Sequence, residues 1–254
     1  MNLLLYKLTL APLLVIGATL AGRRWGQTVA GLVAGFPIVA GPILFFYAIE
    51  QGPAYAASAA QATLLGLFSL CLFAMAYSWR AWMGGTVLSC LMLSWVAFAF
   101  GTSMVSRVHT DLTQSFLIAL ASLFLASRSL PPSEATGPAG PPSAWDLPLR
   151  GLAAAILVFS LTHFADFLGP RFSGFLTPFP VASTVLAAFA HAQGGGAAVK
   201  AVLKGLLLAL NAFAVFCAVL VLTLPAHGIA FSFSLALAAA CSVQAILFWM
   251  TQKR

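Results

Sequence analysis

Nine long apolar segments follow one another along this chain of 254 residues. The segments do not alternate polar and apolar residues as a strand would, and about 20 apolar residues suffice for a helix to cross a bilayer. The chain is 61% hydrophobic and 7% charged, whereas soluble domains carry about 25% charged residues. The sequence therefore predicts an all-α polytopic membrane protein. The predicted spans cover residues 3–21, 27–49, 56–78, 82–101, 111–128, 148–168, 173–192, 198–224 and 229–250.

Two stretches of the chain are diverged copies of each other. Residues 26–54 align without a gap to residues 169–197, with 7 identities in 29 positions. Chance gives about 2–3 identities in so apolar a chain, so we interpret the match as an internal repeat. The predicted domains are a first repeat of four spans (1–105), a linker with the fifth span and a cytoplasmic Pro/Gly-rich loop (106–147), and a second repeat of four spans (148–254).

The basic residues predict the orientation of the spans. With nine spans, nine of the twelve Lys and Arg residues fall on one side of the membrane and three on the other. Basic residues collect on cytoplasmic loops, so the amino terminus is predicted outside and the carboxyl terminus in the cytoplasm. The majority side carries Arg23, Arg24, Arg80, Arg128, Arg150, Lys200, Lys204, Lys253 and Arg254, and the other side Lys7, Arg107 and Arg171.

An odd number of spans separates equivalent helices, and the two repeats are therefore predicted to be inverted. This prediction depends on the fifth span, residues 111–128, which is the least apolar of the nine. If that segment does not cross the membrane, the two repeats are parallel. The net charge of +7 is explained by this topology, so no nucleic acid partner is expected.

Each repeat carries a Phe-Pro pair inside a predicted span, Phe36-Pro37 in the first and Phe179-Pro180 in the second. Proline removes a helical hydrogen bond, and Pro42 is expected to add a second break. Paired interrupted helices indicate a transporter's substrate site, although a purely structural kink is the alternative. The expected substrate-binding residues are Gly35, Phe36, Pro37, Gly41, Pro42, Thr177, Pro178, Phe179, Pro180, Ser183, Thr184 and Asn211.

Few ionisable residues lie near the spans, and those within a bilayer are functional candidates by default. Glu50 ends the first Phe-Pro helix, whereas its counterpart in the second repeat is the uncharged Gln193. His163 and Asp166 lie within one turn of each other in the sixth span. These three ionisable residues are the candidates for binding a coupling ion or proton, and ordinary solvated groups at helix ends are the alternative.

Several kinds of site have no counterpart in the sequence. The four cysteines each stand alone in an apolar stretch and are expected to be buried structural thiols: Cys71, Cys90, Cys217 and Cys241. No metal-ligand spacing, phosphate-binding loop or serine–histidine–acid arrangement is present, so neither a metal, a cofactor nor an enzymatic activity is expected.

The run Ala30-Gly31-Leu32-Val33, followed by Phe36-Pro37 and Glu50-Gln51-Gly52, resembles the core of the GlpM-like family of small bacterial inner-membrane proteins. The resemblance covers mainly residues 24–66 and, more faintly, 167–207. It implies two four-span units fused in opposite orientations, located in the bacterial inner membrane, but it implies no substrate. The plan is also similar, at the level of the fold alone, to inverted-repeat exporters of the drug/metabolite transporter type.

The leading hypothesis is a small secondary transporter, an exporter of a small molecule, with its site at the two Phe-Pro helices. The alternative is a non-transporting scaffold or lipid-binding subunit of a system that handles an envelope polymer. The expected partners are the lipid bilayer and a small-molecule substrate. An internal pseudodimer is compatible with a monomer, and a homodimer is the alternative.

Overall fold

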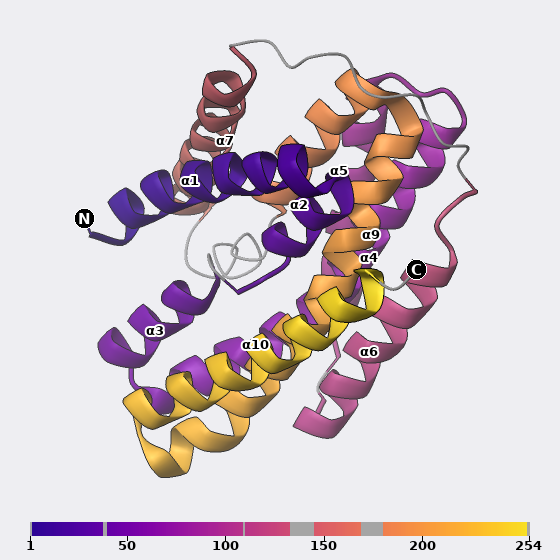
Figure 1. The fold of residues 1–254 in the computed structure, drawn as a ribbon. Coiled ribbons are helices and arrows are strands. Elements are labelled where there is room, and N and C mark those ends of the chain that lie inside the picture. Colours follow the sequence, from indigo (N-terminus) through magenta and orange to yellow (C-terminus); the bar gives the residue numbers. More distant parts are fainter. Residues whose placement is uncertain (1, 38–39, 109, 133–144, 169–179, 253–254) are drawn as a thin grey trace.

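The computed structural model of the protein describes residues 2–37, 40–108, 110–132, 145–168 and 180–252 (Figure 1). Within these ranges all regular structure is helical, which confirms the all-α part of the predicted fold class. The helices are α1 (Asn2–Trp25), α2 (Gln27–Ala34), α3 (Ala40–Glu50), α4 (Pro53–Trp82), α5 (Val87–Val105), α6 (Leu112–Arg128), α7 (Asp146–Leu168), α9 (Val181–His227) and α10 (Ile229–Gln252).

Four of these helices, α4, α5, α9 and α10, are long and apolar enough to cross a membrane. Helix α9 contains most of the two predicted spans 173–192 and 198–224, and at about 1.5 Å per residue its 47 residues would exceed a bilayer if they were straight. The helix is interrupted at Gly195, which has φ 62° and ψ −157°. In Figure 1, α9 rises to the top of the view and then descends again.

Helices α4 and α9 form the centre of the bundle. Their buried side chains include Phe73 and Tyr77 of α4 and Leu203, Leu207 and Leu220 of α9, which belong to one continuous hydrophobic cluster. The surrounding helices instead expose large apolar side chains, a surface that suits hydrocarbon better than water. Examples are Leu88 and Val96 of α5, Leu117 and Phe124 of α6, and Leu237 and Trp249 of α10.

Helix α6, the predicted fifth span, runs alongside α4 in the opposite direction. Before α6 begins, the carbonyl oxygen of Thr110 accepts a hydrogen bond from Gln61 near the start of α4. Just after α6 ends, the carbonyl oxygen of Ser129 accepts one from Trp79 near the end of α4. The 17 residues of α6 thus connect the two ends of the bundle, over roughly 26 Å at 1.5 Å per residue.

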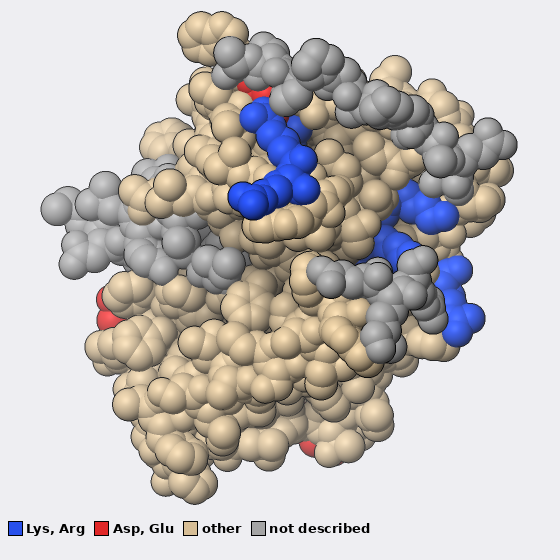
Figure 2. Space-filling model, in the orientation of Figure 1, with Lys and Arg blue, Asp and Glu red and all other residues tan. Residues whose placement is uncertain are grey.

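Basic side chains gather at the end of the bundle where α4 finishes. Arg80 lies in the last turn of α4 and Arg128 in the last turn of α6. Gly196, four residues before Lys200, lies next to the backbone of Ala81. Figure 2 shows Lys and Arg side chains at the upper centre and along the right of the view, and no Lys or Arg among the described residues visible on its lower part.

Helices α1 and α7 are antiparallel neighbours. The end of α1 meets the start of α7 through Arg23 and Asp146, and further along both helices Ile16 lies next to Gly151. The sequence predicts that Asp146 lies in the Pro/Gly-rich loop, and this prediction is wrong, because Asp146 is helical. Asp146 begins α7 and is only 4% exposed, because two arginines bind its carboxylate.

Candidate functional site

The predicted interruption of the second span is present. Helix α2 ends at Ala34 and α3 begins at Ala40, with Pro37 between them. The backbone N–H of Phe36 donates to the carbonyl oxygen of Val33 at 3.3 Å, so the four-residue spacing of an α-helix is lost at this point. Because proline cannot donate a backbone hydrogen bond, the chain turns here instead of continuing as a helix.

The expected second break at Pro42 is wrong. Pro42 is the third residue of α3, which continues unbroken to Glu50. The first turn of a helix has backbone N–H groups without helical partners, so a proline there removes no hydrogen bond. Helix α3 therefore begins directly after the interruption. The backbone N–H of Gly41 donates to the carbonyl oxygen of Pro37 at 3.0 Å.

Small residues before the interruption bring α2 against α9. A Cβ atom on Gly35 would lie 2.6 Å from the Cβ of Ala209 and 2.8 Å from the carbonyl oxygen of Leu206. One turn earlier, Gly31 faces the backbone of α9 with no room for any side chain. The glycines of the Phe-Pro motif thus serve close helix packing, the role that small residues commonly have in membranes.

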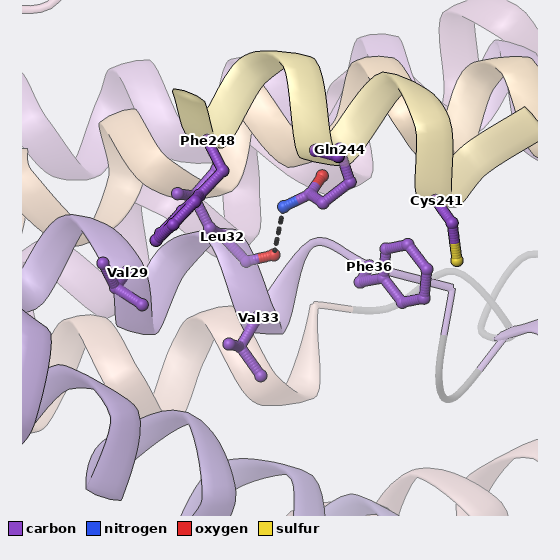
Figure 3. Close-up of a pocket in the computed structure, with 8 residues that line it drawn as sticks. Val29, Leu32, Val33, Phe36, Cys241, Gln244 and Phe248 are labelled. Carbon is purple, nitrogen blue, oxygen red and sulfur yellow. Dashed lines mark hydrogen bonds between the residues drawn. The ribbon is translucent and has the colours of Figure 1, made fainter. Parts of the chain in front are cut away.

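A groove of about 390 Å³ opens between α2 and α10 beside the interruption. At its centre the side-chain amide of Gln244 donates to the carbonyl oxygen of Leu32 at 3.3 Å (Figure 3). In an uninterrupted helix that carbonyl would accept from Phe36, whose N–H turns to Val33 instead. The residues lining the groove are Val29, Leu32, Val33, Phe36, Cys241, Gln244, Ala245 and Phe248.

Gln244 was missed by the reasoning from sequence. The detectable signal was an amide inside the last apolar span, where polar side chains are costly and commonly bond to a neighbouring helix. Its Oε1 atom is buried and has no hydrogen-bond partner among the described residues. Cys241 lies in the same groove and is exposed, contrary to the expected burial, whereas Cys71, Cys90 and Cys217 are buried as expected.

The second Phe-Pro segment is described only from Pro180 onward, and Thr177, Pro178 and Phe179 lie outside the described residues. Pro180 directly precedes α9. Ser183 and Thr184 are buried in the first turn of that helix, and Thr184 accepts a hydrogen bond from the indole of Trp95 at 3.3 Å.

Described residues next to the two Phe-Pro pairs reach one apolar cluster. Val33 and Ala34, at the end of α2, pack against the same buried residues as Val181 and Ala182, at the start of α9. The end of α2 and the start of α9, which lie far apart in the sequence, therefore pack on one cluster inside the bundle.

Asn211 and Glu50 are not among the described residues that line this groove. The amide of Asn211 donates to the carbonyl oxygens of Leu207 and Leu208 in its own helix, at 3.0 and 3.1 Å. Glu50 is exposed at the end of α3. His163 and Asp166 belong to α7, but their side chains lie outside the described part of the structure.

A second polar centre joins three helices at the basic end of the bundle. Asp146 of α7 accepts from Arg23 of α1 at 2.7 Å and from Arg150 of α7 at 3.0 Å. Gln193 of α9 donates to Asp146 and accepts from Arg150. The guanidinium of Arg150 also lies over the ring of Phe189, 4.7 Å from its centre. We refer to Arg23, Asp146, Arg150 and Gln193 as the polar network.

Electrostatics favour the charged form of Asp146, which precedes the predicted span 148–168. Burial raises the pKa of its carboxyl group, but hydrogen bonds from Arg23 and Arg150 outweigh this effect and hold the pKa below its ordinary value. Sequence reasoning missed the network, although Asp146 and Arg150 stand four residues apart, as an ion pair on one helix face requires.

A scan of the chain against protein-family models finds no match, and searches of curated proteins and of solved structures find none either. The resemblance of residues 24–66 to the GlpM-like family therefore stays a prediction.

Proposed function

We propose that the protein is a small secondary transporter whose substrate binds beside the interruption between α2 and α3. One observation carries this proposal: the interruption adjoins a groove of about 390 Å³ that contains a single amide side chain on an apolar wall. Transporters place substrate sites where a membrane helix is broken, because backbone groups become available there. The groove includes Phe36 of the predicted site and adds Gln244.

The second element of the proposal is that the two repeats are inverted. Gly52 and Gly195 are equivalent at the offset of 143 and both have positive φ, 94° and 62°. Gly52 immediately precedes α4, whereas Gly195 directly precedes Gly196, which lies next to Ala81 at the other end of α4. Equivalent turns at opposite ends of one helix are the arrangement that inversion requires.

A further observation supports inversion. Helices α1 and α7, which occupy equivalent positions in the two repeats, are antiparallel neighbours. The repeat itself is supported by Arg150 and the Phe189 ring beneath it, which are matched at the same offset by Lys7 and Phe46. Alternating access in many transporters arises from rocking of such inverted repeats around a central site.

For the orientation in the membrane, we propose that the basic end of the bundle faces the cytoplasm of a bacterial cell. This end carries Arg80 and Arg128 at the ends of α4 and α6 and Arg23 and Arg150 in the polar network. An excess of Lys and Arg marks the cytoplasmic side of a membrane protein.

A non-transporting, lipid-binding component is the second candidate. The observation that favours it is the composition of the groove, in which Gln244 is accompanied by five aliphatic or aromatic side chains, an alanine and a cysteine. A lipid tail would fit such a wall without requiring any movement of the helices. Transport by the purified protein distinguishes the two candidates.

The deciding experiment uses purified protein in liposomes loaded in turn with a broad panel of radiolabelled metabolites, organic cations and amphipathic compounds. We expect counterflow of at least one compound, and we expect Pro37→Ala to abolish it by restoring a continuous helix. Pro42→Ala is the matched control, because Pro42 lies in a helical first turn and its replacement should leave the rate unchanged. No counterflow with any compound, together with tight binding of lipid, would establish the second candidate instead.

A further inference from the structure

We propose that the polar network is the gate that closes the basic end of the bundle during transport. This inference rests on the proposed transport function. The network is the point at which charged side chains of the first repeat (Arg23) and of the second repeat (Asp146, Arg150 and Gln193) meet among the described residues. An alternating-access protein must separate its two repeats at one end while keeping them together at the other.

The network lies directly over the apolar interior that leads to the interruption. Phe189, beneath the guanidinium of Arg150, packs against a buried cluster that contains Ala18 of α1 and Ala154 of α7. Ala34, the last residue of α2, packs against the same cluster. The cluster that reaches the interrupted helix therefore extends to the ring of Phe189, on which Arg150 of the polar network lies.

Helix α1 can move away from α7 without leaving a buried charge unpaired. Asp146 and Arg150 are 4% and 3% exposed, and they pair with each other inside α7. The side chain of Arg23, in contrast, is 31% exposed and already reaches solvent. If α1 moves away, Asp146 keeps Arg150 and Gln193 as partners, while Arg23 becomes hydrated. An unpaired buried charge would make separation far more costly.

This asymmetry distinguishes a gate from a permanent clamp. In a permanent clamp both members of the bond between the repeats would be buried, because complete burial makes the loss of a partner prohibitive. Here the bond between the repeats has one partly exposed member, Arg23, whereas the fully buried pair of Asp146 and Arg150 lies within a single helix. The contact from Arg23 to Asp146 is therefore the one that opens.

The experiment measures access to the interior in native membranes. In a background without the four natural cysteines, Ala154→Cys places one thiol in the cluster beneath the network. A membrane-impermeant maleimide is applied from the side on which Arg24→Cys is labelled, so the result does not depend on the assumed orientation. Removing one charge partner from a two-state equilibrium should raise the labelling rate of Ala154→Cys roughly tenfold in the Arg23→Gln variant.

Arg24→Gln is the matched control. Arg24 stands next to Arg23 and is exposed, and its guanidinium lies over the ring of Trp25, 5.2 Å from its centre. The Arg24→Gln variant loses one positive charge, as Arg23→Gln does, but the labelling rate of Ala154→Cys should stay at the wild-type value. Unchanged labelling in Arg23→Gln, or an equal rise in Arg24→Gln, would overturn the gate.

Further measurements separate the gating role of the polar network from misfolding of the variants and from the proposed transport function. Melting temperatures of the purified variants show whether Arg23→Gln is folded, and Arg23→Lys, which retains the charge, should give labelling between wild type and Arg23→Gln. Labelling requires no substrate. If liposomes show no transport but Arg23→Gln still opens the interior, the transport proposal fails and the conformational role of the network stands.

Discussion

Gly31 of α2 and Gly205 of α9 lie where the backbones of two helices touch. A Cβ atom on Gly31 would lie 2.6 Å from the backbone nitrogen of Leu206 and would collide with the carbonyl oxygen of Val202. A Cβ atom on Gly205 would meet the backbone of Thr28 in the same way, with the carbonyl carbon 2.8 Å away. The contact joins the interrupted helix of the first repeat to the central helix of the second.

Replacing Gly31 by alanine should push these helices apart. Because the colliding atoms belong to the backbone, no side chain can rotate to make room, and we expect a loss of about 1–3 kcal/mol in stability. Thermal unfolding of the purified protein in detergent measures the loss. The control is Gly17→Ala in α1, where an added Cβ meets nothing within 4 Å. This control should be neutral or slightly stabilising, since alanine favours helix.

The turns at Gly52 and Gly195 should respond alike to substitution. Gly52 has φ 94° and ψ 162°, and Gly195 has φ 62° and ψ −157°, conformations that side chains rarely adopt. We expect Gly52→Ala and Gly195→Ala each to lower the stability by about 1–3 kcal/mol. Nothing lies within 4 Å of either added Cβ, so the effect reports backbone strain alone. Melting temperatures that match wild type for either variant would contradict this assignment.

Replacement of Gln244 by leucine should weaken the contact between α10 and the interrupted helix. The variant leaves the Leu32 carbonyl without its amide donor, and bonds of this kind in membrane proteins contribute about 0.6–2 kcal/mol. Thermal unfolding again provides the measurement. Ser242→Ala is the control, because Ser242 is exposed and bonds to Ala238 in its own helix. Equal melting temperatures for the two variants would show that the amide contributes nothing at this site.

The path of α6 predicts which loops share a side of the membrane. Single cysteines in place of Arg24 and Arg128 should react with an impermeant thiol reagent from one side, and a cysteine in place of Arg107 from the other. The reason is that α6 runs from the end of the bundle near Gln61 to the end near Trp79. Labelling of intact spheroplasts and of inverted vesicles gives the answer. Reaction of the Arg107 and Arg128 variants from the same side would mean that α6 does not cross.

What the sequence by itself determined was the class of structure and the place of the interruption. The long apolar runs require helices in lipid, where every backbone polar group must be satisfied. Pro37 cannot continue a helix from the preceding turn, so the break between α2 and α3 followed from local chemistry. Pro42 does not break a helix, because it lies in the first turn of α3, where a backbone N–H has no helical partner.

Only the tertiary structure decided which polar groups find one another. Gln244 is 212 residues from Leu32, and Arg23 is 123 residues from Asp146. The hydrophobic pattern of the sequence could not predict these two contacts, because they arise from the packing of α10 on α2 and of α1 on α7. Asn211 shows the converse case, since its depth in an apolar span indicated a site while its amide bonds to its own helix. The sequence determines where a helix must break, and packing determines what faces the break.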